Sequence, residues 1–150
     1  AATARRATLL PSACCVGCSS AYSEGVSHVI IGGQMQEDKS ILTFAEDEAG
    51  ERLGVQYVSP LTSEPGLVGE IATFARVGRT GLGIGSKLFE ATKAACIAEG
   101  YDWIRANIRA DNTGGLAYYQ SRGFEDYGRI EGYRMGNGQV VDKVLKRYDL

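Results

Sequence analysis

The spacing of apolar and polar residues changes along the chain, and each spacing predicts a different element. From Ile84 to Gly100, apolar side chains recur at the three- and four-residue intervals of one helix face. Gly100 stands where a helix C-terminal cap is expected. The following segment, YDWIRANIRA, alternates apolar and polar residues, which is typical of a half-buried strand. We therefore expect a long helix followed directly by a strand.

The segments before this helix predict mainly strands. ARRATLL is expected to form a short first strand, a helical segment is expected from Pro11 through the cysteines, and HVIIGGQMQEDK is interpreted as a loop. SILTFAEDEAGERLGVQYVSP predicts a hairpin whose second strand runs from about Leu53 to Val58, and LVGEIATFARV predicts another strand.

The segments after it predict one helix and two strands. The helix is expected to follow Asp111-Asn112, which supplies N-cap chemistry, and to end at Gly123. The two final strands flank Asn137-Gly138, a strong hairpin signal. The element order predicts a mixed α/β or α+β layer fold, in one domain that spans residues 1–150.

Composition narrows the function classes. The chain has 150 residues, is 44% hydrophobic and 23% charged, and carries a formal net charge of −2, so it resembles an ordinary globular domain. With that charge we expect neither nucleic acid nor an anionic membrane as a partner. No apolar run approaches the roughly 20 residues that span a bilayer. The first 23 residues lack acids, but Pro11 and Gly17 interrupt them, so a targeting peptide is not favoured and a cytoplasmic protein is expected.

Three of the four cysteines, Cys14, Cys15 and Cys18, lie close together. Cys15 and Cys18 have the spacing of a metal knuckle or a redox pair. A tetrahedral zinc site needs a second pair of ligands, and the single histidine, His28, supplies at most one. We therefore expect no metal, and reduced cysteines that act as small apolar residues.

The segment GRTGLGIGSK, directly before the long helix, is rich in glycine. It is out of register for a Walker A loop, and it does not complete a dinucleotide-binding Gly-x-Gly-x-x-Gly. Gly81, Gly83 and Gly85 still let the backbone approach a ligand at the positive end of a helix. This arrangement suits a pyrophosphate, and a turn without a ligand is the alternative.

A second segment, NTGGLAYYQSRGF, places Asn112 before a short helix and Tyr119 seven residues later, with Gly123-Phe124 after them. Together with GLGIGSKL, it resembles the GNAT superfamily of acyl-CoA-dependent N-acyltransferases. In the first segment, Thr80 stands where that family usually has Arg or Gln, and Arg79 is displaced from that position by one residue.

The resemblance implies a mostly antiparallel sheet of about six to seven strands flanked by helices, with a splayed parallel strand pair that holds acetyl-CoA. The splayed strands would be EIATFARV and YDWIRANI. The backbone near Phe74 and Arg76 would pair with the pantetheine arm, and the loop from Arg79 to Ser86 would hold the pyrophosphate. Within that loop, the resemblance implicates the residues Arg79, Thr80, Gly81, Gly83, Gly85 and Ser86.

The resemblance also implies catalytic roles. Tyr119 is the candidate acid that protonates the departing thiolate, and Glu70 is the candidate base. A water chain, or an acceptor amine that is already neutral, is the alternative to Glu70. Asn112 would cap its helix, bond the coenzyme arm, or do both.

The expected activity is N-acetyl transfer from acetyl-CoA to a primary amine of a small molecule or a protein. A non-catalytic acyl-CoA sensor or interaction module is the rival function. Arg105 and Arg109 would bind an anionic group of the substrate or pair with acids in the sheet. In such folds the final hairpin often shapes the acceptor pocket or a homodimer contact.

Overall fold

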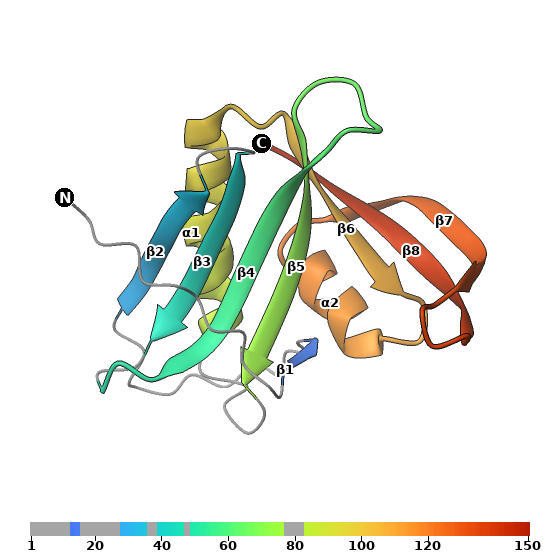
Figure 1. Ribbon diagram of the computed structural model, residues 1–150, viewed down its shortest axis with the longest axis horizontal. Coiled ribbons are helices and arrows are strands. Elements are labelled where there is room, and N and C mark those ends of the chain that lie inside the picture. The colour runs from blue at the N-terminus through green and yellow to red at the C-terminus, as the bar shows by residue number, and fades with distance from the viewer. Residues whose placement is uncertain (1–12, 16–27, 36–38, 47–48, 77–82) are drawn as a thin grey trace.

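A computed structural model describes residues 13–15, 28–35, 39–46, 49–76 and 83–150 of the chain. These residues form one mixed sheet and two helices (Figure 1). The strands are β1 (Ala13–Cys15), β2 (His28–Met35), β3 (Ser40–Glu46), β4 (Arg52–Leu61), β5 (Val68–Arg76), β6 (Trp103–Arg109), β7 (Glu125–Arg134) and β8 (Val140–Asp149). The helices are α1 (Ile84–Glu99) and α2 (Thr113–Ser121).

The strand order across the sheet is β2-β3-β4-β5-β6-β8-β7, and β1 pairs with β5 off this path. Every pairing is antiparallel except that of β5 with β6, which is parallel. This mixed, mostly antiparallel sheet with flanking helices confirms the predicted fold class. The described sheet has eight strands rather than six or seven, because the three-residue β1 pairs with the end of β5, off the main strand order.

Two predictions in the N-terminal part were wrong. Residues 28–35 form β2 rather than a loop, and a register shift between Gly32 and Met35 accommodates the two adjacent glycines against β3. Residues 13–15 form β1 rather than part of a helix, because they find a pairing edge on β5. The strand expected at ARRATLL lies outside the described residues.

The remaining elements match their sequence patterns. Gly100 adopts a left-handed φ of 85° and caps α1, as expected. β6 alternates as predicted: Ile104, Ala106 and Ile108 are buried, and the polar residues between them are half-buried. The final hairpin closes through residues 135–139, with Gly138 at a left-handed φ of 86°.

The core lies between the sheet and its helices. α1 packs across β2, β3, β4 and β5 (Figure 1). Phe89 of α1 contacts Phe124 and Tyr148, with ring centroids 5.5 and 5.2 Å apart, and Phe124 contacts Tyr119 at 5.1 Å. This aromatic cluster joins α1, the end of α2 and β8, and so fixes α2 relative to the sheet.

Candidate active site

The two parallel strands at the centre of the sheet pair over only part of their length. Their register runs from Val68 opposite Trp103 to Ile71 opposite Ala106. β5 then continues to Arg76 and β6 to Arg109 with no further pairing between them among the described residues. Figure 1 shows the two strands diverging beyond this point, with α2 close to the gap. The structure therefore contains the splayed parallel pair that the sequence predicted.

A cavity of about 320 Å³ opens at this divergence. Its walls come from β4, β5, β6, α2, β8 and the final hairpin loop. The lining residues are Tyr57, Ser59, Glu70, Ile71, Ala72, Thr73, Asn107, Ile108, Arg109, Asn112, Gly115, Tyr118, Tyr119, Met135 and Lys143. Three of the predicted site residues, Glu70, Asn112 and Tyr119, thus share one cavity.

Asn112 fixes the start of α2 at the cavity wall. Its side-chain oxygen accepts a hydrogen bond from the backbone N–H of Gly115 at 2.9 Å, which is an N-cap interaction. A Cβ at Gly115 would lie 2.6 Å from the Asn112 amide nitrogen, so a larger residue there would displace the capping side chain. The capping role expected for Asn112 is therefore present.

Tyr119 lies two turns further along α2, where a buried polar network holds its hydroxyl. The hydroxyl lies 2.8 Å from Thr73 Oγ1. Gln56 Nε2 donates to Thr73 Oγ1 at 3.1 Å and to the Tyr118 hydroxyl at 2.8 Å. Tyr118 in turn donates to the Gly85 carbonyl at 2.7 Å. Hydrogen bonds thus link the first turn of α1 to the candidate acid.

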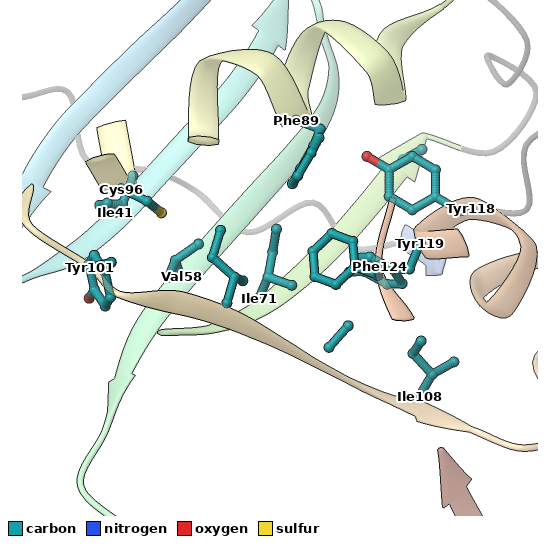
Figure 2. Close-up of a cluster of buried hydrophobic side chains, with 13 residues drawn as sticks. Ile41, Val58, Ile71, Phe89, Cys96, Tyr101, Ile108, Tyr118, Tyr119 and Phe124 are labelled. Atoms are coloured by element: carbon teal, nitrogen blue, oxygen red, sulfur yellow. The ribbon is translucent and has the colours of Figure 1, made fainter. Parts of the chain in front are cut away.

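The surroundings of the two tyrosines are mostly apolar. Tyr118 and Tyr119 are 1% and 6% exposed, and their rings meet edge to face at 5.0 Å. Figure 2 shows both residues in the buried cluster that also holds Phe124 and Ile71. Hydrogen bonds and charges act more strongly in such a water-poor environment than in bulk solvent.

Glu70, the candidate base, forms an ion pair. It lies opposite Arg105 in the β5–β6 register, and the Arg105 guanidinium donates from Nε and Nη2 to the Glu70 carboxylate, with the Nε contact at 2.8 Å. Arg109 forms a two-point contact with Asp111, at 3.0 and 2.7 Å. Both arginines of this β6 face thus pair with acids, which was one of the two expected alternatives.

The N-terminus of α1 lies close to the end of α2. Gly83 is its N-cap, with a left-handed φ of 69°, and no side chain caps the helix. The guanidinium of Arg122, at the end of α2, donates to the Ser86 hydroxyl in the first turn. Arg122 thus places a cation beside the N-terminus of α1, where an anion is stabilised. The candidate residues Arg79, Thr80 and Gly81 lie outside the described residues.

The edge of β5 beyond its pairing with β6 is occupied by β1. Cys15 pairs with Phe74, and Ala13 pairs with Arg76. β4 already holds the other edge at this level, where Val55 pairs with Phe74. β1 therefore covers the edge that the sequence analysis assigned to the pantetheine arm. Coenzyme pairing at Phe74 and Arg76 stays a prediction, and it requires β1 to leave this edge.

Several side chains of this region were not predicted from the sequence: Gln56, Thr73, Arg122 and Lys143. Arg122 lies inside the motif that identified Tyr119, so its charge was a usable signal. Gln56 and Thr73 lie on strands whose polar and apolar residues alternate in the ordinary way. Only the β4–β5 register places the two side chains next to each other.

Cys96 is fully buried, and burial raises the pKa of its thiol to about 12, so it stays protonated and is a poor nucleophile near neutral pH. Across the described ranges, no three His, Cys, Asp or Glu side chains gather as a metal site would need. None of the described helices has the length and apolar character to cross a membrane.

Comparisons with known proteins agree at the level of structure. No family model matches the sequence, and no curated protein matches it. Many solved structures are similar to this chain, and three of them serve as examples. A GNAT-family acetyltransferase from Streptococcus pneumoniae has a TM-score of 0.66 and 21% identity, over 78% of this chain and 71% of that one.

A ribosomal-protein-alanine N-acetyltransferase from Brucella melitensis has a TM-score of 0.65 and 24% identity, over 74% and 69% of the two chains. A GNAT-superfamily phosphinothricin acetyltransferase from Sinorhizobium meliloti, in complex with acetyl-CoA, has a TM-score of 0.65 and 23% identity, over 74% and 61%.

The aligned part covers between 61% and 71% of the length of such neighbours. For some of them, including one from Acinetobacter baylyi at 63%, it covers less than two thirds. At these identities the likeness establishes the fold. This chain has the fold of the GNAT acetyltransferases, with its cavity at the split between the parallel strands.

Proposed function

We propose that this chain is a GNAT-type N-acetyltransferase that moves an acetyl group from acetyl-CoA to a primary amine. The acceptor is a small molecule or a protein, and the amine attacks directly in a ternary complex. The observation that carries the proposal is the position of the Tyr119 hydroxyl. Tyr119 lines the cavity at the divergence of β5 and β6, and hydrogen bonds through Thr73, Gln56 and Tyr118 link its hydroxyl to the first turn of α1.

The N-terminus of α1 is the proposed pyrophosphate site. The N-cap residue, Gly83, has no side chain and makes no side-chain cap hydrogen bond. Arg122 supplies a positive charge there through its contact with Ser86. In the related loops, an Arg or Gln at the position of Thr80 helps to bind the pyrophosphate. Arg122 would provide that contact in this chain.

Acetyl-CoA supplies the acetyl group as a thioester. The acceptor nitrogen, once it has lost its proton, forms a bond to the acetyl carbonyl carbon, and the carbon–sulfur bond then breaks. The sulfur leaves with the bonding electrons and takes a proton from the Tyr119 hydroxyl. The attacking nitrogen loses one proton as it becomes an amide, and transfer of that proton restores the Tyr119 hydroxyl. Thr73 holds that hydroxyl in place before the reaction, so the proton transfer needs little reorganisation.

Glu70 is the proposed acceptor of the amine proton, either directly or through a water molecule. An alkylammonium has a pKa near ~10, so at neutral pH most of the acceptor must lose a proton before it can attack. The Arg105 contact occupies Glu70 Oε2. A proton could then be accepted at the other carboxylate oxygen, and an acceptor that is already neutral would need no base.

The same ion pair favours a second candidate function. With Glu70 held by Arg105, the cavity has no carboxylate without a cationic partner among its described residues. A domain that binds acyl-CoA without turning it over, as a sensor or interaction module, would need the coenzyme site and no base. Turnover with any amine would exclude this alternative.

The test is calorimetric titration of the purified protein with acetyl-CoA, with ATP and NAD as controls. We expect micromolar binding of acetyl-CoA and CoA, and no comparable binding of ATP or NAD. Arg122→Gln should weaken acetyl-CoA binding about tenfold, because it removes one charge-assisted contact. Arg134→Gln, which changes an exposed arginine on β7, is the matched control and should bind as the wild type does.

Absence of CoA binding, or a preference for ATP or NAD, would contradict the proposal. Equal affinities for the Arg122 and Arg134 variants would remove Arg122 from the site while leaving the activity proposal in place.

A further inference from the structure

The charged groups of the cavity do not balance. The charged residues of its lining are Glu70, Arg109 and Lys143. Glu70 pairs with Arg105, and Arg109 pairs with Asp111. Lys143 has no carboxylate within 4.0 Å in the part of the chain that the structure describes; its ammonium lies 3.7 Å from the centroid of the Tyr133 ring. After these pairings, one positive charge is left over at the cavity wall.

The position of Lys143 makes that charge costly in the absence of a ligand. Lys143 of β8 lies directly opposite Arg109 of β6 in the antiparallel register, so both side chains lie on one face of the sheet. Like charges directly opposite each other destabilise a sheet. Asp111 neutralises only one of the two. An anion bound between them would relieve the repulsion.

The same wall also contains an unsatisfied hydrogen-bond acceptor. Asn107 lines the cavity two residues before Arg109 on β6, on the same face of the strand. Its Oδ1 atom is buried and has no hydrogen-bond partner. Rotation about χ2, which is a soft torsion for asparagine, would turn this oxygen toward the cavity. A buried acceptor without a partner is unfavourable, and an N–H donor would satisfy it.

These groups complement a ligand with an anion and an amine close together. Asn107 pairs with Leu145, so Lys143 is its diagonal neighbour across the strand pair. Diagonal neighbours lie about 7–8 Å apart, which the long lysine side chain can span. The apolar side chains of Ile108 and Met135 line the same space. The wall therefore offers a cation, a hydrogen-bond acceptor and an apolar surface.

We infer that the acetyl acceptor is a free amino acid, whose carboxylate binds Lys143 and Arg109 and whose amino group lies near Asn107. This inference rests on the proposed function, which requires an amine in this cavity. It excludes a protein lysine as the preferred acceptor, because a lysine side chain carries no carboxylate beside its amine. The two cations are specificity-determining residues, and Tyr119 keeps its role in the transfer.

The experiment compares acetylation of L-methionine and L-phenylalanine with acetylation of their carboxamides. Amidation removes the negative charge and keeps the amine and side chain. Amidation also changes the basicity of the amine. We therefore compare the ratio of kcat/KM for the acid to kcat/KM for the amide between variants. The effect of basicity is the same in every variant, so it cancels in this comparison. Lys143→Met should lower this ratio at least tenfold, the loss of one charge-assisted contact. Lys143→Arg should retain most of it.

Lys93→Met is the matched control. Lys93 also lies over a tyrosine ring, 5.2 Å from the centroid of Tyr148, but it belongs to α1 and does not line the cavity. We expect its acid-to-amide ratio to equal that of the wild type. The acetyl-CoA dissociation constant of each variant is measured in parallel.

The outcomes separate the two proposals. If the protein binds acetyl-CoA and the ratio is unchanged in Lys143→Met, the amino acid inference is wrong and the proposed function stands. If Lys143→Met instead weakens acetyl-CoA binding at an unchanged ratio, the cation serves a coenzyme phosphate and the inference is again overturned. If the wild type binds no acetyl-CoA, both proposals fail.

Discussion

At the scale of single residues, the feature with the clearest chemical consequence is the fixed Tyr119 hydroxyl. A tyrosine hydroxyl in water samples many orientations, whereas this one is buried and held by Thr73 at 2.8 Å. Thr73 is itself held by Gln56, whose side chain is fully buried. Each member of the network thus restricts the next, and the proposed acid is oriented before any substrate arrives.

Tyr119→Phe keeps the ring and removes only the hydroxyl. We expect kcat to fall about 100-fold, the lower range for loss of a general acid, with the acetyl-CoA dissociation constant changed less than threefold. Steady-state kinetics and calorimetry on the same preparation measure the two effects. Tyr101→Phe removes another hydroxyl, one that donates to the Lys39 carbonyl away from the cavity, and should leave turnover unchanged. An unchanged kcat in Tyr119→Phe would disprove its acid role.

The sequence predicted individual site residues unevenly. Asn112 and Tyr119 were found because both lie on one short helix, where spacing along the chain reflects spacing in the fold. The contact between Glu70 and Arg105 was considered only as one alternative, because their sequence separation is 35 residues and strand register decides it. Lys143 was missed for the same reason: its cavity neighbour Arg109 faces it from another strand.

At the scale of elements, the sequence predicted those whose local patterns agree with their environment. The periodic face and the Gly100 cap of α1 are local signals, and the helix formed as expected. β2 was not predicted because Gly32 and Gly33 interrupt its strand pattern, and β1 was not predicted because its partner β5 lies far along the chain. β2 tolerates two adjacent glycines because β3 provides its ladder, and among the described strands β1 pairs with β5 alone.

The β7–β8 hairpin supplies part of the cavity wall, and Asp142 supports its turn end. The Asp142 carboxylate accepts the Gly132 backbone N–H at 3.0 Å and the Arg129 guanidinium at 2.7 Å. These contacts, the backbone bond first, hold the pKa of Asp142 below its ordinary value of 3.8. A carboxylate with a lowered pKa in the folded state stabilises the fold above its unfolded-state pKa, and this contribution disappears as the pH falls through the lowered value.

Asp142→Asn should therefore lower the melting temperature at pH 7 by about 1–3 °C, since the group is at the surface. The difference from the wild type should shrink below about pH 4, as the wild-type carboxyl becomes protonated. Thermal unfolding followed by circular dichroism from pH 2 to pH 7 measures this dependence. Glu131→Gln, on the same hairpin, is the control. A difference that stays constant with pH would show that charge at Asp142 is not responsible.

At the scale of the whole molecule, β1 and the proposed coenzyme arm compete for one edge of the sheet. If binding needs a state in which β1 has left β5, the apparent affinity falls by the fraction of molecules in that state. Cys14→Pro should raise that fraction, because proline lacks the backbone N–H that a ladder uses and restricts φ. We expect acetyl-CoA to bind Cys14→Pro several-fold more tightly than Cys14→Ala, which keeps the backbone donor.

Calorimetric titration of both variants provides the comparison. Equal affinities would mean that β1 and the coenzyme do not exclude each other. A weaker Cys14→Pro variant would mean that β1 supports the site instead of blocking it.

The short parallel ladder from Val68 to Ile71 also has a mechanical consequence. The sheet consists of two halves, β2–β5 and β6–β8, which this ladder joins at one end only. The aromatic cluster of Phe89, Phe124 and Tyr148 connects the two halves a second time. A ligand in the cavity would contact both halves and connect them at the end where β5 and β6 are not paired. A bound ligand would then restrict the motion of the two halves relative to each other, so the rigidity of the whole molecule would depend on occupancy of the cavity.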